Sequence, residues 1–144
     1  MSDIIGVIYP VPKKFVDRLM VKNRTVFVKY LGGRATNPKI FPNHKLVFYA
    51  SHDAKELVGE AKIKSVELLT PIEVLDKYGN RVFLDKVELM NYATQRGRTL
   101  SKKLLVLTLC AIKPYSPPIK WTESMTMAGK YLREQEYREL VKRE

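Results

Sequence analysis

The sequence predicts one α+β domain, a mixed β-barrel of about five to six strands with helices at its mouth and a further helix at the C-terminus. Residues 45–70 carry this prediction, because two strand-like runs are joined there by a short polar link at 51–56. The run LVFY at 46–49 is continuously apolar or aromatic, which suits a strand covered on both faces, as in a closed barrel. In the second run apolar residues alternate with Glu and Lys, so one face is buried while the other meets solvent. The alternation slips near Ser65, which indicates a bulge.

Three elements and a loop are expected before this hairpin. Residues 4–9 are an apolar strand that Pro10 and Pro12 end. A helix follows at Pro12, with an apolar face made of Phe15, Val16, Leu19 and Met20. Residues 25–31 alternate as a strand, and a basic loop then spans residues 34–44.

Four elements and an extended connector are expected after the hairpin. A short helix opens at Pro71 and closes at Gly79, and a second begins at Asp85 and runs to about Gln95. Asp85 and Glu88 have the spacing of a capping box, and Leu84 and Leu89 that of a hydrophobic staple. Residues 104–112 form a buried strand, and residues 115–119 an extended connector, because two prolines disfavour a helix or a central strand. Residues 122–143 are predicted to form the final helix.

The chain is strongly basic, with a formal net charge of +11 over 144 residues and a pI of about 9.8. Residues 1–45 carry nine Lys or Arg against two acids, and residues 96–144 carry eleven against five, whereas the middle is slightly acidic. Positive charge gathers on one side if the two ends meet in space, and the expected partner is then a polyanion such as RNA. The alternative is a uniformly charged, solubilising surface, as in a heat-adapted protein.

Several classes of site are disfavoured. The single cysteine, Cys110, lies in an apolar run and is expected to be a buried thiol. His44 and His52 do not form a metal-ligand spacing with it, and no P-loop is present, so neither a metal nor another cofactor is expected. No secretion leader or apolar stretch of membrane-spanning length is present, which predicts a cytoplasmic protein without a membrane partner.

One polar constellation remains as a candidate RNA- or anion-binding site. Its Lys and Arg side chains suit phosphate contacts, and its aromatic ring suits stacking on a base. The alternative is a solvated charged face with the aromatic ring in the core. The candidate residues are Lys22, Arg24, Thr25, Lys29, Ser51, His52, Tyr92, Arg96 and Arg98.

The order of these segments, with LVFYAS, LVGEAKI, LMNYATQRG and YSPPI in turn, resembles the PUA-like superfamily and within it the ASCH type of domain. It also resembles a small, mainly archaeal family of uncharacterised PUA-like proteins. The resemblance covers residues 4–120 and implies a mixed β-barrel that binds RNA or modified nucleotides. Some ASCH proteins are hydrolases of acylated nucleosides or ribonucleases, so a hydrolase is a second possibility.

The ASCH signature Gly-x-Lys-x-x-Glu-x-Arg falls on residues 22–29. Lys22 replaces its glycine, while Arg24 and Lys29 stand for its lysine and arginine. Phe27 stands where an acidic residue is expected, which removes a group able to move a proton. The sequence therefore favours binding of RNA or a modified nucleotide in a basic cleft without catalytic machinery.

Two alternatives remain open. One is a hydrolase in which Lys29 or Arg24 stabilises an oxyanion and an acid such as Glu60 acts as base. The other is a protein-interaction adaptor that uses the C-terminal helix. Residues 1–120 are expected to form the barrel, and residues 121–144 a helix packed on it or extending from it.

Overall fold

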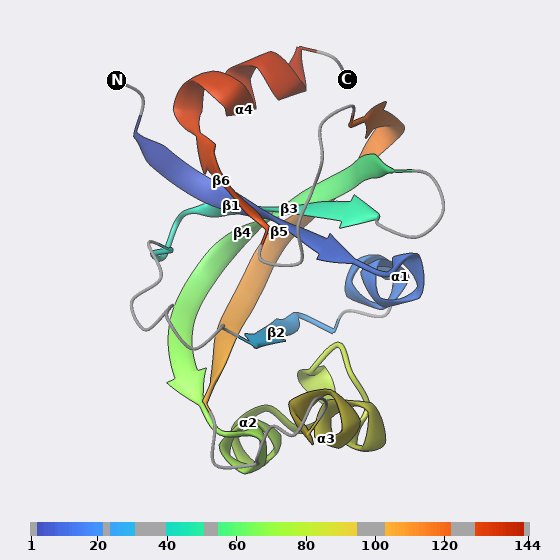
Figure 1. Ribbon diagram of the computed structural model, residues 1–144, viewed down its shortest axis with the longest axis vertical. Helices are drawn as coiled ribbons and strands as arrows, with labels where there is room; N and C mark the ends of the chain where they lie inside the picture. Colours follow the sequence, from blue (N-terminus) through green and yellow to red (C-terminus); the bar gives the residue numbers. More distant parts are fainter. Residues whose placement is uncertain are drawn as a thin grey trace.

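The computed structural model describes residues 3–21, 24–30, 40–50, 55–94, 103–121 and 129–142. It contains a mixed six-stranded sheet in the order β2-β5-β4-β3-β1-β6 (Figure 1). The strands are β1 (Ile4–Val11), β2 (Val26–Tyr30), β3 (Lys45–Ala50), β4 (Glu56–Leu69), β5 (Leu104–Lys120) and β6 (Lys130–Arg133). The helices are α1 (Lys13–Val21), α2 (Pro71–Tyr78), the 3-10 turn η1 (Gly79–Arg81), α3 (Lys86–Thr94) and α4 (Glu134–Val141).

The predicted hairpin lies at the centre of this sheet. β3 and β4 pair antiparallel, with Leu46 opposite Ala61, and residues 46–50 of β3 are all buried. The register between β4 and β5 shifts between Ile63 and Ser65, so the predicted bulge is confirmed. Six strands and an α+β architecture are confirmed as well.

β1 lies between β3 and β6. It runs parallel to β3, with Val7 opposite Leu46, and antiparallel to β6. The strand continues through Pro10 to Val11, two residues beyond the predicted end. Gly6 is required by this pairing, because a Cβ atom there would lie 2.1 Å from the carbonyl oxygen of Lys45.

The predicted connector at 115–119 is wrong, because β5 continues to Lys120. Ile119 pairs with Leu57, whereas Pro114 pairs with Gly59. Four residues of β5 therefore stand opposite one residue of β4, and Pro117 and Pro118 lie inside this bulge. Prolines are tolerated there because the ladder does not require their missing N–H groups.

The predicted helix over 122–143 is also wrong at residues 130–133. Residues 130–133 form β6, which completes the sheet beside β1, and α4 begins only at Glu134. Gly129 precedes β6 with φ +78°, a left-handed conformation that a glycine adopts at little cost. Residues 122–128 lie outside the described residues.

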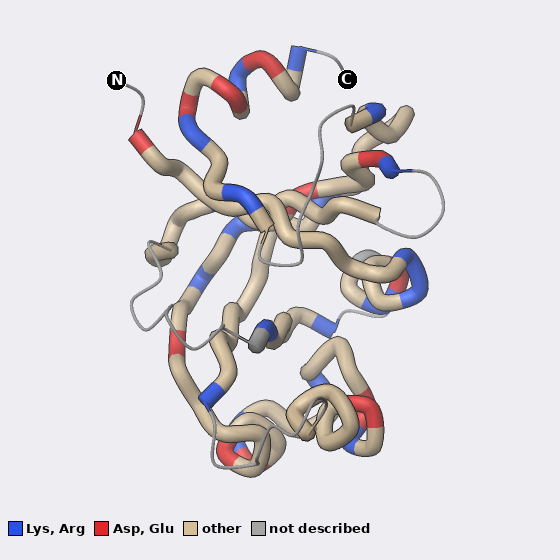
Figure 2. Tube along the Cα trace, viewed as in Figure 1, with Lys and Arg blue, Asp and Glu red and all other residues tan. Residues whose placement is uncertain are grey.

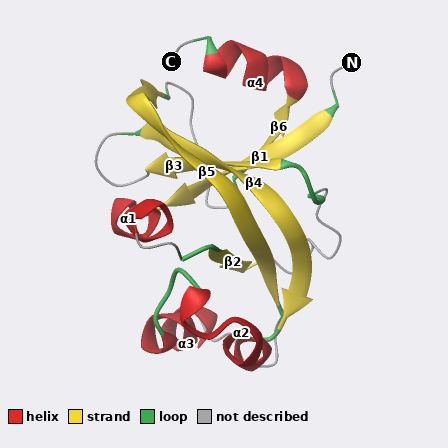
Figure 3. Ribbon diagram, turned by 180° about the vertical axis from the view of Figure 1, so that it is seen from behind, coloured by secondary structure: helices red, strands yellow, loops and turns green. Residues whose placement is uncertain are grey.

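Two hydrophobic clusters lie on the two faces of the sheet. Strand alternation separates them, since Leu46 and Phe48 join the first cluster and Val47 and Tyr49 the second. The first cluster fills the concave side, which α1, α2 and α3 cover, and α4 covers the second cluster through Leu140 (Figures 1 and 3). The sheet is therefore barrel-like, although no hydrogen-bonded pairing between its end strands β2 and β6 is recorded among the described residues.

Side-chain caps mark the starts of α2 and α3, with a complete capping box at α2. At α2 the Thr70 hydroxyl accepts a hydrogen bond from the Glu73 N–H at 3.3 Å, and a Glu73 carboxylate oxygen accepts one from the Thr70 N–H at 2.9 Å. At α3 a Glu88 carboxylate oxygen accepts one from the Asp85 N–H at 2.8 Å, which confirms the predicted helix start. None of the helices in the described part of the chain is long and apolar enough to cross a lipid bilayer.

Candidate functional site

A cavity of about 370 Å³ opens at the mouth of the barrel, between α1, β2 and α3. We call it the mouth cleft. Its apolar lining is Pro10, Val11, Pro12, Phe15, Phe27, Val28, Phe83 and Leu84, and its polar lining is Lys14, Lys29, Glu88, Asn91 and Tyr92. This volume lies within the range of small-molecule sites, which are mostly apolar with few polar groups.

Aromatic rings form the base of the mouth cleft. Tyr9 stacks on Phe27 with ring centroids 5.8 Å apart, and Phe83 lies 4.9 Å from Phe27 and 5.7 Å from Phe15. Phe27 and Phe83 are buried, whereas Phe15 and Tyr92 are only partly buried. The cleft therefore offers partly exposed aromatic surface from two helices above a packed aromatic base.

Lys29 brings a cation into this aromatic setting. Its residue is only 9% exposed, and its Nζ lies 5.3 Å from the centroid of the Tyr9 ring, a cation–π geometry. Burial, with a smaller contribution from neighbouring tyrosines, raises the pKa of Tyr9 well above its ordinary value, so its ring stays neutral. Lysines are seldom buried to this extent unless a partner stabilises the charge, which makes Lys29 the most distinctive polar group in the cleft.

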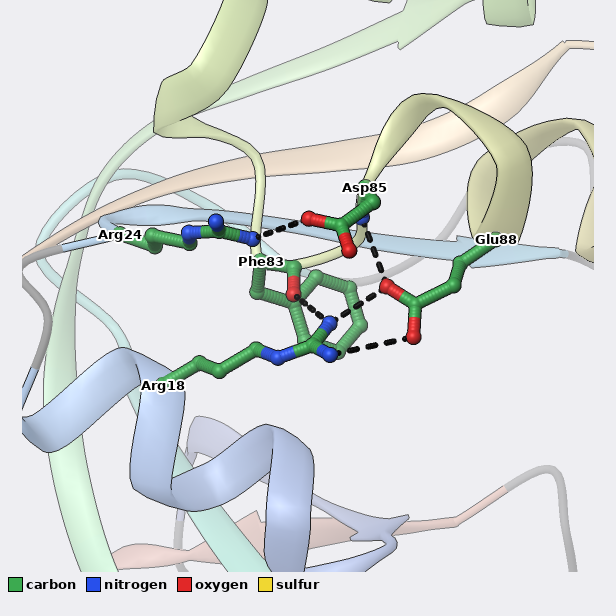
Figure 4. A network of polar contacts seen from close by, with 5 residues as sticks. All are labelled: Arg18, Arg24, Phe83, Asp85 and Glu88. Atoms are coloured by element: carbon green, nitrogen blue, oxygen red, sulfur yellow. Dashed lines mark hydrogen bonds and ion pairs between the residues drawn. The ribbon is translucent and has the colours of Figure 1, made fainter.

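Two ion pairs tie the start of α3 to the segments before it (Figure 4). The Arg18 guanidinium donates to both carboxylate oxygens of Glu88, at 2.5 and 3.1 Å, and to the Phe83 carbonyl at 3.2 Å. The hydrogen bond from Arg18 is the main reason that the pKa of Glu88 falls to about 2. Arg24 donates to Asp85 at 2.9 Å. The contacts of Arg18 with Glu88 and Phe83 hold the α3 wall of the mouth cleft against α1, whereas Arg24 and Asp85 line the neighbouring cavity described next.

A second cavity, which we call the helix groove, lies between α2 and α3 and has a volume of about 580 Å³. It is lined by Arg24, Ile72, Leu75, Asp76, Gly79, Asn80, Leu84, Asp85, Lys86 and Met90. Leu84 lines both cavities, so the two are neighbours.

The structure distributes the predicted site residues over both cavities. Lys29 and Tyr92 line the mouth cleft, whereas Arg24 lines the helix groove. The Thr25 hydroxyl accepts a hydrogen bond from Arg81 at 3.3 Å and lines neither cavity. The remaining predicted residues, Lys22, Ser51, His52, Arg96 and Arg98, lie outside the described residues.

Sequence reasoning missed the residues that give the cleft its shape. Phe83, Asn91 and Arg18 were not predicted as site residues, and Glu88 was recognised only as a cap. The sequence contained one indication that Glu88 lies near the site, because Glu88 sits in the first turn of a helix that also carries the predicted site residue Tyr92. Nothing in the sequence pairs Glu88 with Arg18, which lies 70 residues away.

Glu60, the general base in the hydrolase alternative, faces the other side of the sheet. It is 4% exposed and accepts hydrogen bonds from Lys45 at 2.8 Å, Tyr115 at 3.1 Å and Tyr137 at 2.8 and 3.0 Å. Burial alone would raise the pKa of Glu60, but these hydrogen bonds outweigh it and hold the pKa below its ordinary value. We call these four residues the Glu60 cluster; it joins α4 to the sheet and does not line the mouth cleft.

Basic residues do not all converge on the mouth. Figure 2 shows Lys and Arg spread over α1, β4 and α4. Near the C-terminus, Arg138 pairs with Glu134 and Lys130 with Glu136. Within the described ranges, the cations that line the mouth cleft are Lys14 and Lys29, both from the N-terminal part of the chain. No group of three or more His, Cys, Asp or Glu is placed there to hold a metal ion in those same ranges, and Cys110 is half-buried rather than buried.

Comparison with known proteins adds the family. A family model described as "Domain of unknown function (DUF365)" matches residues 4–134. The chain belongs to the DUF365 family. Among curated proteins, this DUF365 chain is 32% identical over 106 residues to "Uncharacterized protein MJECS03" of Methanocaldococcus jannaschii, covering 69% of this chain and 98% of that protein.

Solved structures place the DUF365 chain among ASCH-type folds. The crystal structure of ASCH from Zymomonas mobilis matches with a TM-score of 0.79 at 18% identity and covers 97% of this chain and 96% of that one. The N-terminal domain of Staphylothermus marinus McrB matches with a TM-score of 0.61 at 16% identity and covers 100% and 99%. The ASCH-type, PUA-like fold that the sequence motifs predicted is confirmed.

Proposed function

We propose that this protein binds single-stranded RNA or a nucleotide, and that it holds one base in the mouth cleft. The observation that carries the proposal is the pairing of partly exposed aromatic rings, Phe15 and Tyr92, with the deeply placed ammonium of Lys29. Flat bases stack on aromatic side chains, and lysines contact phosphate or base oxygens. The fold neighbours support the same class of ligand only through the shared ASCH-type fold.

The polar groups at the rim suit the remaining parts of a nucleotide. Lys14 is exposed at the edge of the cleft, and its Nζ lies 4.9 Å from the Phe15 ring centroid. A phosphate beside Phe15 would therefore find a cation close to the ring that stacks its base. Asn91 is exposed on the α3 side of the same cleft, where its amide can both donate to and accept from a base edge.

Binding is favoured over hydrolysis by the state of the carboxylate in the cleft. Among the described residues that line it, Glu88 is the single carboxylate. Both of its oxygens accept from Arg18, and its pKa of about 2 makes it a weak base. Phe27, at the position where the ASCH signature has an acid, is packed in the aromatic base. The adaptor alternative is disfavoured because α4 already buries Leu140 against the sheet.

The test is a titration of fluorescently labelled single-stranded RNA at several salt concentrations. For a single strand, about four phosphate contacts give a slope near −3 when the logarithm of the binding constant is plotted against the logarithm of the salt concentration. Lys29→Met is expected to weaken binding by about 1–3 kcal/mol, the range for charge-assisted contacts, while the thermal melt shows that the fold is retained. The matched control is Lys142→Met, an exposed lysine just after α4. Absence of binding at low salt, or equal losses in the two variants, contradicts the proposal.

A further inference from the structure

We propose that the helix groove is a second nucleotide subsite, which takes the nucleotide next to the one held in the mouth cleft. In this arrangement Arg24 leaves Asp85 and binds the phosphate between the two nucleotides. The inference rests on the proposed function, and it names the ligand as an oligonucleotide rather than a mononucleotide.

The first support is the position of the two cavities. Leu84 lines both, so the two cavities adjoin at this residue. Asp85 lines the helix groove and Glu88 the mouth cleft, although both belong to the first turn of α3 or its cap. A chain that leaves the mouth cleft across Leu84 therefore enters the helix groove directly.

The second support is the chemistry of the helix groove. Ile72, Leu75 and Met90 give it an apolar floor, and Ile72 is 52% exposed. A large exposed apolar side chain inside a concave surface favours a flat, partly apolar occupant such as a base. Asn80 and Asp76 add an amide and a carboxylate at the lining, which suit the exocyclic amino and ring groups of a base.

The third support is the contrast between the two ion pairs in Figure 4. Arg18 makes three hydrogen bonds and its side chain is 19% exposed, so it is held in place. Arg24, whose side chain is 26% exposed, donates one hydrogen bond within the described ranges, to an Asp85 side chain that is 55% exposed. An ion pair with one exposed partner and one hydrogen bond among the described residues contributes little to stability, so Arg24 can exchange its carboxylate for a phosphate while water solvates Asp85. Lys86, exposed on the same lining, adds a second cation.

The geometry also separates the roles of Arg24 and Lys29. Because they line different cavities, they do not share one bound anion. Lys29 is expected to act on every nucleotide ligand, whereas Arg24 is expected to act only on ligands long enough to cross Leu84. Their effects on dinucleotide binding are therefore close to additive.

The experiment compares the four nucleoside 5′-monophosphates with the corresponding 5′-phosphorylated homodinucleotides by isothermal titration calorimetry. For at least one base, the dinucleotide is expected to bind at least tenfold more tightly than its mononucleotide. Arg24→Gln should remove most of that gain and leave the mononucleotide affinity within twofold of the unsubstituted protein. Arg138→Gln is the matched control, because Arg138 also makes an exposed ion pair but lies on α4.

A second measurement locates the added nucleotide. In NMR titrations, the dinucleotide should shift the methyl signals of Ile72 and Met90, which the mononucleotide leaves in place. Mononucleotide binding without any dinucleotide gain, or a gain that Arg24→Gln does not reduce, overturns the inference and leaves the proposed function standing. Shifts confined to residues outside the helix groove also overturn it. A protein that binds neither ligand overturns both proposals.

Discussion

The Glu60 cluster gives a sharp stability prediction for Tyr137→Phe. The substitution keeps the ring and removes one hydroxyl, which donates to both carboxylate oxygens of Glu60 at 2.8 and 3.0 Å. After the change each oxygen keeps one donor, Tyr115 on one and Lys45 on the other. The loss is therefore one hydrogen bond to a buried charge, which is worth about 1.5–3 kcal/mol of unfolding free energy.

The pH dependence of this loss has a defined sign. The pKa of Glu60 is lowered below its ordinary value of 4.5 in the folded protein, so its contribution to stability is present above that value and is lost as the pH falls through the folded pKa. Tyr137→Phe removes one of the groups that lower it. The difference between the two proteins should therefore be fully present near neutral pH and shrink under acid.

Urea unfolding at neutral and acidic pH measures both effects. The control is Tyr49→Phe, since Tyr49 is buried in the same cluster of apolar residues and no hydrogen bond of its hydroxyl is recorded within the described residues. A Tyr137→Phe loss no greater than that of Tyr49→Phe, or one that persists unchanged when Glu60 is protonated, would refute the reasoning.

Three further changes test the mouth and the edge of the sheet. Glu88→Gln should lower the free energy of unfolding by at least about 1 kcal/mol near neutral pH. Because the pKa of Glu88 in the folded protein is about 2, acid unfolding curves should show this loss disappearing only as the pH falls from 4.5 through that value. Thr70→Ala should lower stability by about 0.5–2 kcal/mol in a thermal melt through loss of the α2 cap, whereas an unchanged melt would show that the cap contributes nothing. Gly129→Ala should be strongly destabilising, because its Cβ would lie 2.4 Å from the Ile8 carbonyl oxygen and its φ is +78°. A melting temperature equal to that of the unsubstituted protein would contradict the placement of β6.

The predictions from sequence succeeded where one local pattern decided the structure. The hairpin, its bulge near Ser65 and the start of α3 at Asp85 depend on alternation and capping within a few residues. They failed where distant partners decided it. The strand β6 is only four residues long, and it pairs with β1, which lies near the other end of the chain. The prolines of β5 were excluded from a strand because sequence alone does not show that they stand in a bulge.

The candidate site was predicted only in part, because it too depends on contacts between segments that are distant in the sequence. Lys29 and Tyr92 line the mouth cleft as polar and aromatic candidates in a strand and a helix. Alternation along residues 25–31 puts Lys29 and Phe27 on the same face of the strand, and both line the mouth cleft. By contrast, Arg24 belongs to the helix groove because Asp85, 61 residues away, attracts its guanidinium. A charge pattern indicates that cations are available, but only the fold decides which carboxylate each one meets.

The parallel pairing of β1 with β3 has a consequence for the order in which the chain folds. Val7 pairs with Leu46 on one side and with Tyr131 on the other. Because these two partners are far apart in the sequence, they are synthesised at widely separated times. The hairpin of β3 and β4 is local, so we expect it to form early and β1 to dock on it while the other edge of β1 still exposes unpaired N–H and C=O groups. Until residues 130–133 are synthesised, we expect that open edge to be a place where the nascent chain can pair with another copy.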